Sequence, residues 1–292
     1  MMLPHTDRSV LQEVVLDSDC RVWIKRDDLI HPFISGNKWR KLRLYLELAQ
    51  ARGVQHIITA GGPFSNHILA VSYACAVMGL RCTALVLGRQ QPNNHYRMLA
   101  ARWGLQTVYL NHQEFADRQH WVKTHHPGKE VMFIEVGGAG DPGAAGCAEI
   151  WDEFPFQPDV LVLATATGTT MQGLLAGRDK RNLHTHIIGI PVLFNAAEQL
   201  AALEAKGYQN CTLKTGFECG GFARVDVQLM KFIEAQIQRT NILFDPVYTG
   251  KAWLGLHCLL ERGSIAPDAK IVFLHTGGSL GLFSERYLDF FR

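Results

Sequence analysis

Short apolar runs alternate with amphipathic segments along most of this 292-residue chain. That alternation is typical of βαβ units, in which helices cover the faces of a mainly parallel sheet. The expected strands are 57–60, 82–87, 107–110, 131–136, 160–164, 187–192 and 271–275. The expected helices are 65–80, 94–103, 113–123, 144–154 and one that starts near 279. The pattern therefore predicts an α/β protein.

Charge and length restrict the kind of partner. Lysine and arginine number 29 and aspartate and glutamate 27, so the net charge is +2 and no strong field exists to gather nucleic acid or a membrane surface. Single cores stop growing at about 250–300 residues, and no long linker interrupts the chain. We therefore expect two lobes that share an interface, with a small molecule bound in the cleft between them.

The cysteines indicate a reducing compartment. The chain has seven of them, an odd number, with no Cys-x-x-Cys spacing. The start of the chain has no apolar signal region, and the most apolar stretch, 68–80, is too short to span a bilayer. We expect a cytoplasmic protein without a membrane segment.

Two glycine-rich motifs resemble known sites but lack what those sites require. Residues 138–143 fit the dinucleotide pattern G-x-G-x-x-G, yet the acidic residue expected after the next strand is missing, so a tight turn is preferred. Ser279 lies in a G-x-S-x-G pattern, but the last histidine, His275, precedes it, which is the wrong order for a hydrolase triad. Ser279 is predicted to be a helix N-cap.

A loop rich in threonine follows the apolar strand at 160–163. Thr167, Gly168, Thr169 and Thr170 stand where a helix is expected to begin. Free amides at a helix N-terminus, with small hydroxyl side chains, can bind a phosphate without lysine or arginine. A capped turn without a ligand is the alternative for this segment alone.

Two further segments make the phosphate interpretation more specific. Lys38 lies where a loop becomes an amphipathic helix, a position suited to a Schiff-base amine, although a solvated lysine is the alternative. The loop 61–67 could hold a carboxylate at another helix start. A phosphate cradle, a reactive lysine and a carboxylate site together describe a pyridoxal-phosphate enzyme.

The chain resembles the 1-aminocyclopropane-1-carboxylate deaminase and D-cysteine desulfhydrase group of fold-type-II pyridoxal-phosphate enzymes. The resemblance rests on the ordered segments 25–28, 36–42, 65–67, 165–170, 245–251 and 275–278. It implies a two-lobed, tryptophan synthase β-like fold of parallel sheets flanked by helices. The small lobe is expected at 43–140, and the large, cofactor-binding lobe at 1–42 and 141–292.

The same resemblance implies a role for each candidate residue. Lys38 would form the Schiff base with pyridoxal 5'-phosphate, and Tyr248 would be an acid or base. The substrate carboxylate would be received by Ser65, Asn66 and His67, with Ser65 also catalytic. Asn66 would contact the 3'-oxygen of the cofactor, and Thr276 its pyridine nitrogen. Its phosphate would be held by Thr167, Gly168, Thr169 and Thr170. Lys38 and Thr249 would also contact the cofactor. No metal is expected.

Departures from the family pattern bear on the substrate. Thr249 stands where the deaminases carry a glutamate, and Phe222 falls where a second active-site tyrosine is customary. Thr169 and Met171 replace a customary glycine and a glutamine or histidine. We therefore expect elimination and deamination of a small amino acid, foremost D-cysteine, giving a keto acid, ammonia and sulfide.

Two alternatives stay open. One is a deaminase that opens the cyclopropane ring to 2-ketobutyrate, and the other is a non-catalytic pyridoxal-phosphate-binding protein. Enzymes of this kind would be classed as lyases or hydrolases. We also expect a homodimer.

Overall fold

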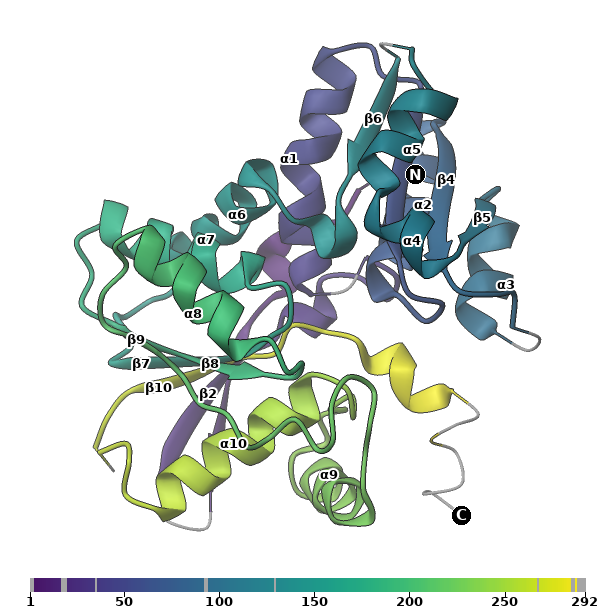
Figure 1. Cartoon of the computed structure of the whole chain (residues 1–292). Coiled ribbons are helices and arrows are strands. Elements are labelled where there is room, and N and C mark those ends of the chain that lie inside the picture. The colour runs from purple at the N-terminus through teal and green to yellow at the C-terminus, as the bar shows by residue number, and fades with distance from the viewer. Residues whose placement is uncertain are drawn as a thin grey trace.

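The computed structural model describes residues 3–16, 20–34, 36–91, 94–128, 130–266, 268–284 and 287. It has two lobes, each built around its own sheet (Figure 1). The larger sheet has the strand order β1 (Leu11–Val15), β2 (Arg21–Lys25), β10 (Ile271–Leu274), β7 (Val160–Thr165), β8 (His186–Pro191), β9 (Cys211–Leu213). The smaller has the order β5 (Gln106–Leu110), β4 (Arg81–Leu87), β3 (His56–Gly61), β6 (Val131–Ile134). Apart from the antiparallel pair β1–β2, neighbouring strands are parallel.

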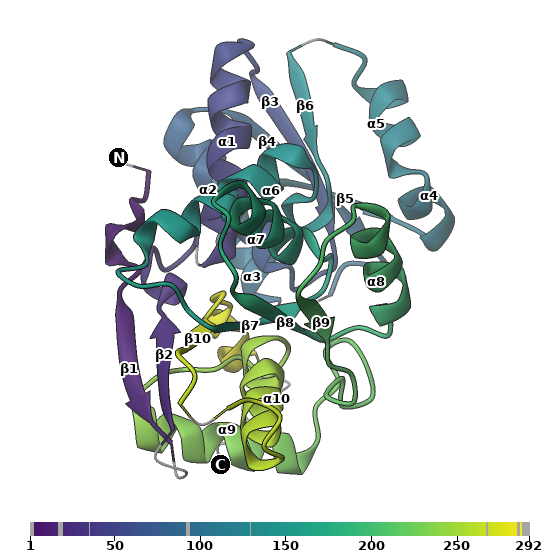
Figure 2. The ribbon, with the colours of Figure 1, turned by 90° about the vertical axis from the view of Figure 1, so that its left-hand side faces the viewer.

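Helices surround both sheets, as the two views at right angles show (Figures 1 and 2). Those close to the smaller sheet are α1 (Asn37–Ala51), α2 (Asn66–Met78), α3 (His95–Arg102), α4 (His112–Ala116) and α5 (Arg118–His125). The others are α6 (Asp141–Ala148), α7 (Thr169–Lys180), α8 (Ala196–Ala205), α9 (Val227–Thr240) and α10 (Thr249–Glu261). Short 3-10 helices occur at Thr6–Arg8, Asp27–Leu29, Val136–Gly138, Glu149–Glu153 and Ser279–Phe283.

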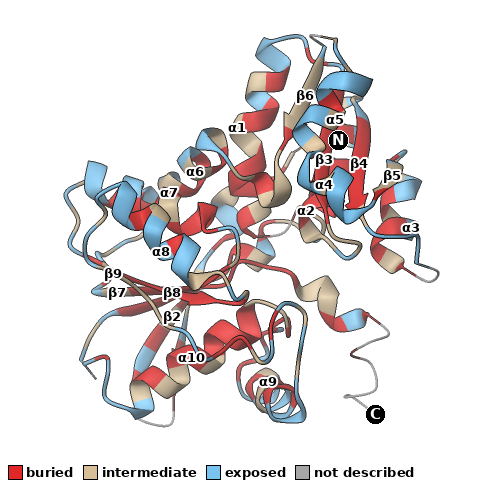
Figure 3. Ribbon diagram, viewed as in Figure 1, coloured by how far each residue is buried: buried red, intermediate tan, exposed pale blue. Residues whose placement is uncertain are grey.

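The central strands are buried over most of their length, while the helices expose their outer faces (Figure 3). Every residue of β3 is buried, including Ile57, Ile58 and Ala60. This explains why the strands appear in the sequence as continuous apolar runs: helices cover both faces of a parallel sheet, so no face alternates with polar residues. Within the described residues, no helix is both long enough and apolar enough to cross a membrane.

Glycines allow α1, α6 and α7 to pack closely. A Cβ atom on Gly146 of α6 would lie 1.9 Å from the Arg40 carbonyl oxygen on α1, and one on Gly173 of α7 would lie 2.1 Å from the Ala144 oxygen. Only glycine permits these approaches. The three helices therefore form one closely packed unit, which fixes the start of α1 relative to the start of α7.

A buried ionic network holds the start of α1 against the larger sheet. The Arg40 guanidinium donates to both oxygens of Asp27, at 2.6 and 2.7 Å, and to Glu153 at 2.7 Å. Lys25 on β2 pairs with the same Glu153 at 2.7 Å. Removing one partner from such a network leaves an uncompensated buried charge. The charged segment 25–28 therefore has a structural role.

The predicted elements are found, with differences at their ends. The helix expected at 113–123 is two helices that meet at Asp117, whose backbone is not helical. The strand expected to end at Val136 ends at Ile134, because Val136 begins a 3-10 turn containing Gly137 in the left-handed region. Ser279 is wrong as an N-cap, since Gly278 caps the short helix there.

Two further boundaries differ. The helix expected at 144–154 starts at Asp141 and becomes 3-10 after Ala148. The predicted lobe boundary at 42/43 falls inside α1. The strands of the smaller sheet all lie between 56 and 134, and the division into 43–140 and the remainder stays a prediction.

Candidate active site

A cavity of about 750 Å³ lies where the two lobes meet. Its wall contains the first residues of α1 and α2, the loop before α7 and the loop that follows β10. Of the candidate residues, the cavity is lined by Lys38, Ser65, Asn66, His67, Thr167, Gly168, Thr170, Tyr248 and Thr276. Thr169 and Thr249 are buried behind the wall. Segments separated by more than 200 residues thus converge, in a volume within the range of about 300–1,000 Å³ that is usual for cofactor sites.

Lys38 is placed by the residues immediately before it. Gly36 has φ of +63°, and a Cβ there would lie 1.9 Å from the Thr276 carbonyl oxygen, so only glycine fits. The Asn37 amide nitrogen donates to that same oxygen at 3.3 Å. The Asn37 side chain accepts a hydrogen bond from Lys38 Nζ at 2.7 Å. The Gly-Asn-Lys sequence therefore holds the amine beside the end of β10.

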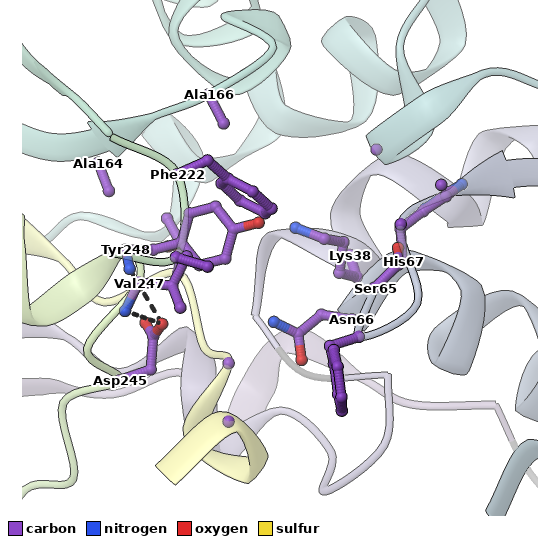
Figure 4. Close-up of a pocket in the computed structure, with 18 of the residues that line it drawn as sticks. Lys38, Ser65, Asn66, His67, Ala164, Ala166, Phe222, Asp245, Val247 and Tyr248 are labelled. Carbon is purple, nitrogen blue, oxygen red and sulfur yellow. Dashed lines mark hydrogen bonds between the residues drawn. The ribbon is translucent and has the colours of Figure 1, made fainter. Parts of the chain in front are cut away.

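The Lys38 amine is unprotonated to a large extent near neutral pH. Burial, together with the positive charge of the neighbouring Lys41, lowers its pKa from 10.5 to about 7. About half of the amines are then neutral at pH 7, which a nucleophile requires. Burial also lowers the pKa of Lys41, whose Nζ donates to the Gly137 oxygen at 3.1 Å. Lys38 is the better nucleophile by position, because its amine points toward Tyr248 across the cavity, whereas the Lys41 amine is bound to the Gly137 oxygen (Figure 4).

The start of α2 presents small polar groups. Ser65 is its N-cap and accepts a hydrogen bond from the Ile68 amide at 3.3 Å, and Asn66 Oδ1 accepts one from the Tyr96 hydroxyl at 2.9 Å. The remaining amides of this first helical turn can bind an anion. The predicted carboxylate site is thus a helix N-terminus facing the cavity.

The His67 side chain turns away from Lys38 (Figure 4). Its Nε2 lies 2.9 Å from the Thr59 hydroxyl, which donates to the Ile134 oxygen at 2.8 Å. Because the hydroxyl hydrogen is already used, Nε2 must carry the imidazole proton. Burial, with Lys38 and Lys41 nearby, lowers the pKa of His67 well below 6.5, so the ring stays neutral. Any contact of His67 with a carboxylate would therefore come from its backbone.

The threonine-rich loop leads into the N-terminus of α7. Gly168 is the N-cap, with φ of +76°, and α7 runs for 12 residues behind it. Thr170 Oγ1 accepts a hydrogen bond from Asn37 Nδ2 at 2.9 Å, and the hydroxyls of Thr167 and Thr169 are 3.0 Å apart. Free amides, hydroxyls and the helix dipole favour an anion here.

The opposite wall carries Tyr248, whose hydroxyl points toward the Lys38 amine (Figure 4). Buried Asp245 fixes this segment: its carboxylate accepts hydrogen bonds from the amides of Val247 and Tyr248, both at 2.9 Å. It also accepts one from the Thr249 hydroxyl at 2.9 Å, so that hydroxyl is directed away from the cavity. Burial and Asp245 raise the pKa of Tyr248 well above 10, so this side chain remains a proton donor.

Several cavity residues were not among the sequence candidates, including Tyr96, Asp245, Ser284 and Tyr287. The Tyr287 hydroxyl donates to the Ala223 oxygen at 3.2 Å. The Ser284 hydroxyl is buried without a hydrogen-bond partner among the described residues. Apart from Asp245, which lies in the 245–251 segment, no motif contains these residues, because only the folded protein brings them to the cavity.

A lysine with a lowered pKa and the N-terminus of α7 thus face the same cavity. The family model described as pyridoxal-phosphate dependent enzyme matches residues 11–277. The chain belongs to this family, and its fold is fold type II. The predicted family, fold class and cofactor are confirmed.

Individual relatives agree with this assignment. A Pyrococcus furiosus protein named putative 1-aminocyclopropane-1-carboxylate deaminase is 30% identical, over 92% of this chain and 88% of its own length. D-cysteine desulfhydrase of Yersinia enterocolitica is 28% identical, over 90% of this chain and 88% of its own. The crystal structure of a 1-aminocyclopropane-1-carboxylate deaminase homologue superposes with a TM-score of 0.84 at 27% identity, covering 97% of this chain and 94% of that one.

The cavity residues fit pyridoxal 5'-phosphate. Thr165, the last residue of β7, lines the cavity two residues before the loop 167–170, and its hydroxyl is buried without a hydrogen-bond partner among the described residues. A buried unpaired hydroxyl so close to the N-terminus of α7 fits a ligand with acceptor oxygens at that end of the cavity. Among the described residues no group of three or more histidine, cysteine, aspartate or glutamate side chains could hold a metal ion.

Proposed function

We propose that this enzyme eliminates the β-substituent of a small amino acid, foremost D-cysteine, giving a keto acid, ammonia and sulfide. The observation that carries the proposal is the ring of Phe222 beside Tyr248, with centroids 6.0 Å apart. At this wall Tyr248 has a hydroxyl and Phe222 has none, while the Thr249 hydroxyl is bound to Asp245. Elimination of a thiolate requires fewer positioned acids than opening a carbon ring, which must protonate carbon.

The cradle at 167–170 would hold the cofactor phosphate, with Thr167, Gly168 and Thr170 at the cavity and Thr169 behind them. Lys38 would hold the cofactor through its amine, Asn66 would contact the 3'-oxygen and Thr276 the pyridine nitrogen. Thr249 as a cofactor contact remains a prediction that this geometry does not favour. The bound cofactor supplies an electron sink for the pair left when the α-proton is removed.

The protein's own groups supply the remaining steps. The N-terminus of α2, with Ser65, Asn66 and the His67 backbone, orients the substrate carboxylate. The Lys38 amine, with its pKa near 7, accepts the α-proton. The Tyr248 hydroxyl, which its raised pKa keeps protonated, donates a hydrogen bond to the departing sulfur. The proton that Lys38 takes from carbon passes to sulfur, and water then converts the remaining unsaturated amine into the keto acid and ammonia.

We assign the reaction to the lyases, because elimination breaks the carbon–sulfur bond without water. The expectation that the enzyme could also be classed as a hydrolase is therefore wrong. We place the enzyme in the cytoplasm, in keeping with free thiols at all seven cysteines. The homodimer stays a prediction that light scattering tests.

The test is a panel of D- and L-amino acids, scored for ammonia, sulfide and keto acid. We expect kcat/KM to be highest for D-cysteine, with sulfide and keto acid formed in equal amounts. Ring opening as the main activity would instead give 2-ketobutyrate from 1-aminocyclopropane-1-carboxylate at the higher kcat/KM. A yellow protein that releases no ammonia from any member would indicate a non-catalytic binder.

A further inference from the structure

Two side-chain amides hold the carbonyl group at the start of the phosphate cradle. Asn195 Nδ2 donates to the Ala166 oxygen at 2.9 Å, and Gln199 Nε2 donates to the same oxygen at 3.2 Å. Gln199 Nε2 also donates to Asn195 Oδ1 at 2.8 Å. We call Asn195 and Gln199, which lie just before and within α8, the amide clamp.

The hydrogen-bond pattern fixes the orientation of both amides. The Ala166 oxygen can only accept, so each side chain must present its NH₂ group to it. Exchanging the NH₂ group and the oxygen of either side chain would place a side-chain oxygen against the Ala166 oxygen. In this orientation Gln199 Oε1 is left buried without a hydrogen-bond partner among the described residues, although only 7% of Gln199 is exposed.

The clamp sets the direction of the next amide group. The described peptide bonds include no cis bond, and in a trans peptide the C=O and N–H point in opposite directions. Because the Ala166 oxygen is held toward α8, the Thr167 N–H points away from α8. Ala166 and Thr167 both line the main cavity, so an N–H that points away from α8 is placed to serve a ligand in that cavity.

Packing alone does not hold the loop in this position. A second cavity of about 140 Å³ lies on the α8 side of the loop, lined by Thr167, Gly168, Gln199 and neighbouring residues. A glutamine with an unpaired buried oxygen lowers the stability of the folded protein. The packing of α8 does not require a glutamine at this position. A buried polar residue that disfavours folding is expected where it serves a site.

We propose that Asn195 and Gln199 are positioning residues that orient the Thr167 amide toward the cofactor phosphate. They act through the Ala166–Thr167 peptide and contact neither substrate nor cofactor. This inference rests on the proposed placement of the phosphate at 167–170. It assigns to α8 a part in binding the cofactor.

The test compares two ligands that differ only in the phosphate, pyridoxal 5'-phosphate and pyridoxal. Their dissociation constants are measured by absorbance with the full-length protein after removal of cofactor. In Gln199→Leu the constant for pyridoxal 5'-phosphate is expected to rise about tenfold, as for the loss of one hydrogen bond to a charged group. The constant for pyridoxal is expected to stay within about twofold, because it has no phosphate for the Thr167 amide to bind.

Three further variants complete the design. Gln199→Glu keeps the shape but replaces the NH₂ donor, so it should lose phosphate selectivity as Gln199→Leu does. Asn195→Ala changes a half-buried residue and serves if Gln199→Leu does not fold. Glu204→Gln, on an exposed position of α8, is the control and should leave both constants unchanged.

Unchanged binding of both ligands to the clamp variants, or an equal loss of both, would overturn the inference. The Gly168→Val variant separates this failure from that of the proposed phosphate site. If Gly168→Val binds pyridoxal 5'-phosphate more weakly while the clamp variants bind it as the unmodified protein does, only the proposed role of the amide clamp is wrong. If Gly168→Val also keeps it, the phosphate lies elsewhere and both proposals fall.

Discussion

Asn37 Nδ2 donates a hydrogen bond to Thr170 Oγ1 at 2.9 Å, across 133 residues of sequence. The bond joins the first residue of α1 to the second residue of α7. The other end of the same amide, Oδ1, accepts from Lys38 Nζ. One side chain thus connects the reactive amine with the phosphate cradle, so the two halves of the proposed cofactor site have a fixed separation.

Lys38→Ala should remove covalent attachment of the cofactor. Lys38 is the lysine that combines a position at the start of a helix with a pKa near neutrality. The purified protein should be yellow, and borohydride reduction followed by peptide mapping should place the label on Lys38. A label that persists in Lys38→Ala and maps to Lys41 would refute the assignment.

Gly168→Val should reduce cofactor retention by about tenfold or more. Gly168 has φ of +76°, a conformation that a β-branched residue disfavours strongly, so the N-terminus of α7 would be distorted. Retention is measured as bound pyridoxal 5'-phosphate after dialysis. Gly207→Val is the control: it also has a positive φ, but nothing lies near its Cβ position and it is distant in sequence from the cradle. Equal retention in the two variants would contradict this role of the loop.

The sequence was informative where local chemistry decides the structure. Lys38 could be found because it stands where a loop becomes an amphipathic helix, whereas the reason for Gly36, its close approach to Thr276, appears only in the structure. The end of strand β6 was misplaced because the apolar Val136 continues the strand pattern, while Gly137 turns the chain. Local preference does not reveal which of the two effects dominates.

Long-range partners of the site were beyond the sequence. Tyr96 and Tyr287 reach the cavity from segments whose own patterns give no chemical signal. The proposed roles of Asn195 and Gln199 depend on the direction of one peptide bond, which long-range hydrogen bonds from these two side chains to the Ala166 oxygen fix. Thr249 shows the converse, since its place in a motif did not reveal that its hydroxyl binds Asp245.

Lys38→Met should flatten the dependence of stability on pH. The folded protein lowers the pKa of Lys38 from 10.5 to about 7, so between these pH values the unfolded state binds more protons. The free energy of unfolding of the cofactor-free protein therefore rises with pH across this window. Removing the amine removes this part of the slope, while Lys41, whose pKa is also lowered, leaves a remainder.

Urea unfolding at several pH values from 7 to 10 measures this slope. The variant should also be the more stable form at pH 7, because it has no partly charged buried amine. Lys206→Met, at an exposed position, is the control and should keep the slope of the unmodified protein. An unaltered slope in Lys38→Met would show that Lys38 titrates at an ordinary pKa.

Asp245→Ala should lower the free energy of unfolding by about 2–4 kcal/mol, as expected when several buried donors lose one cap. The carboxylate accepts from the amides of Val247, Tyr248 and Thr249 and from the Thr249 hydroxyl. Asp226→Ala is a matched control, because Asp226 caps α9 through one amide and is exposed. It should cost about 1 kcal/mol. Equal costs in urea unfolding would mean that the Asp245 network contributes little.

Phe222→Tyr should raise ring opening relative to elimination. Phe222 lies beside Tyr248 at the cavity wall, and a tyrosine there would add a proton donor at a position that has none. Opening 1-aminocyclopropane-1-carboxylate must protonate carbon, and a positioned acid or base commonly contributes about 10²–10⁴-fold in rate. We expect kcat/KM for this substrate to rise by about tenfold or more, with D-cysteine changed by less than about threefold.

The measurement compares kcat/KM for both substrates in the unmodified protein and in Phe222→Tyr. Phe222→Leu is the control, since it removes the ring without adding a hydroxyl and should not favour ring opening. Before any substitution, the larger kcat/KM should belong to D-cysteine, because elimination of a thiolate needs no acid at position 222. If 1-aminocyclopropane-1-carboxylate is instead the better substrate of the unmodified protein, Phe222 is not a barrier to ring opening, and the deaminase alternative replaces the desulfhydrase proposal.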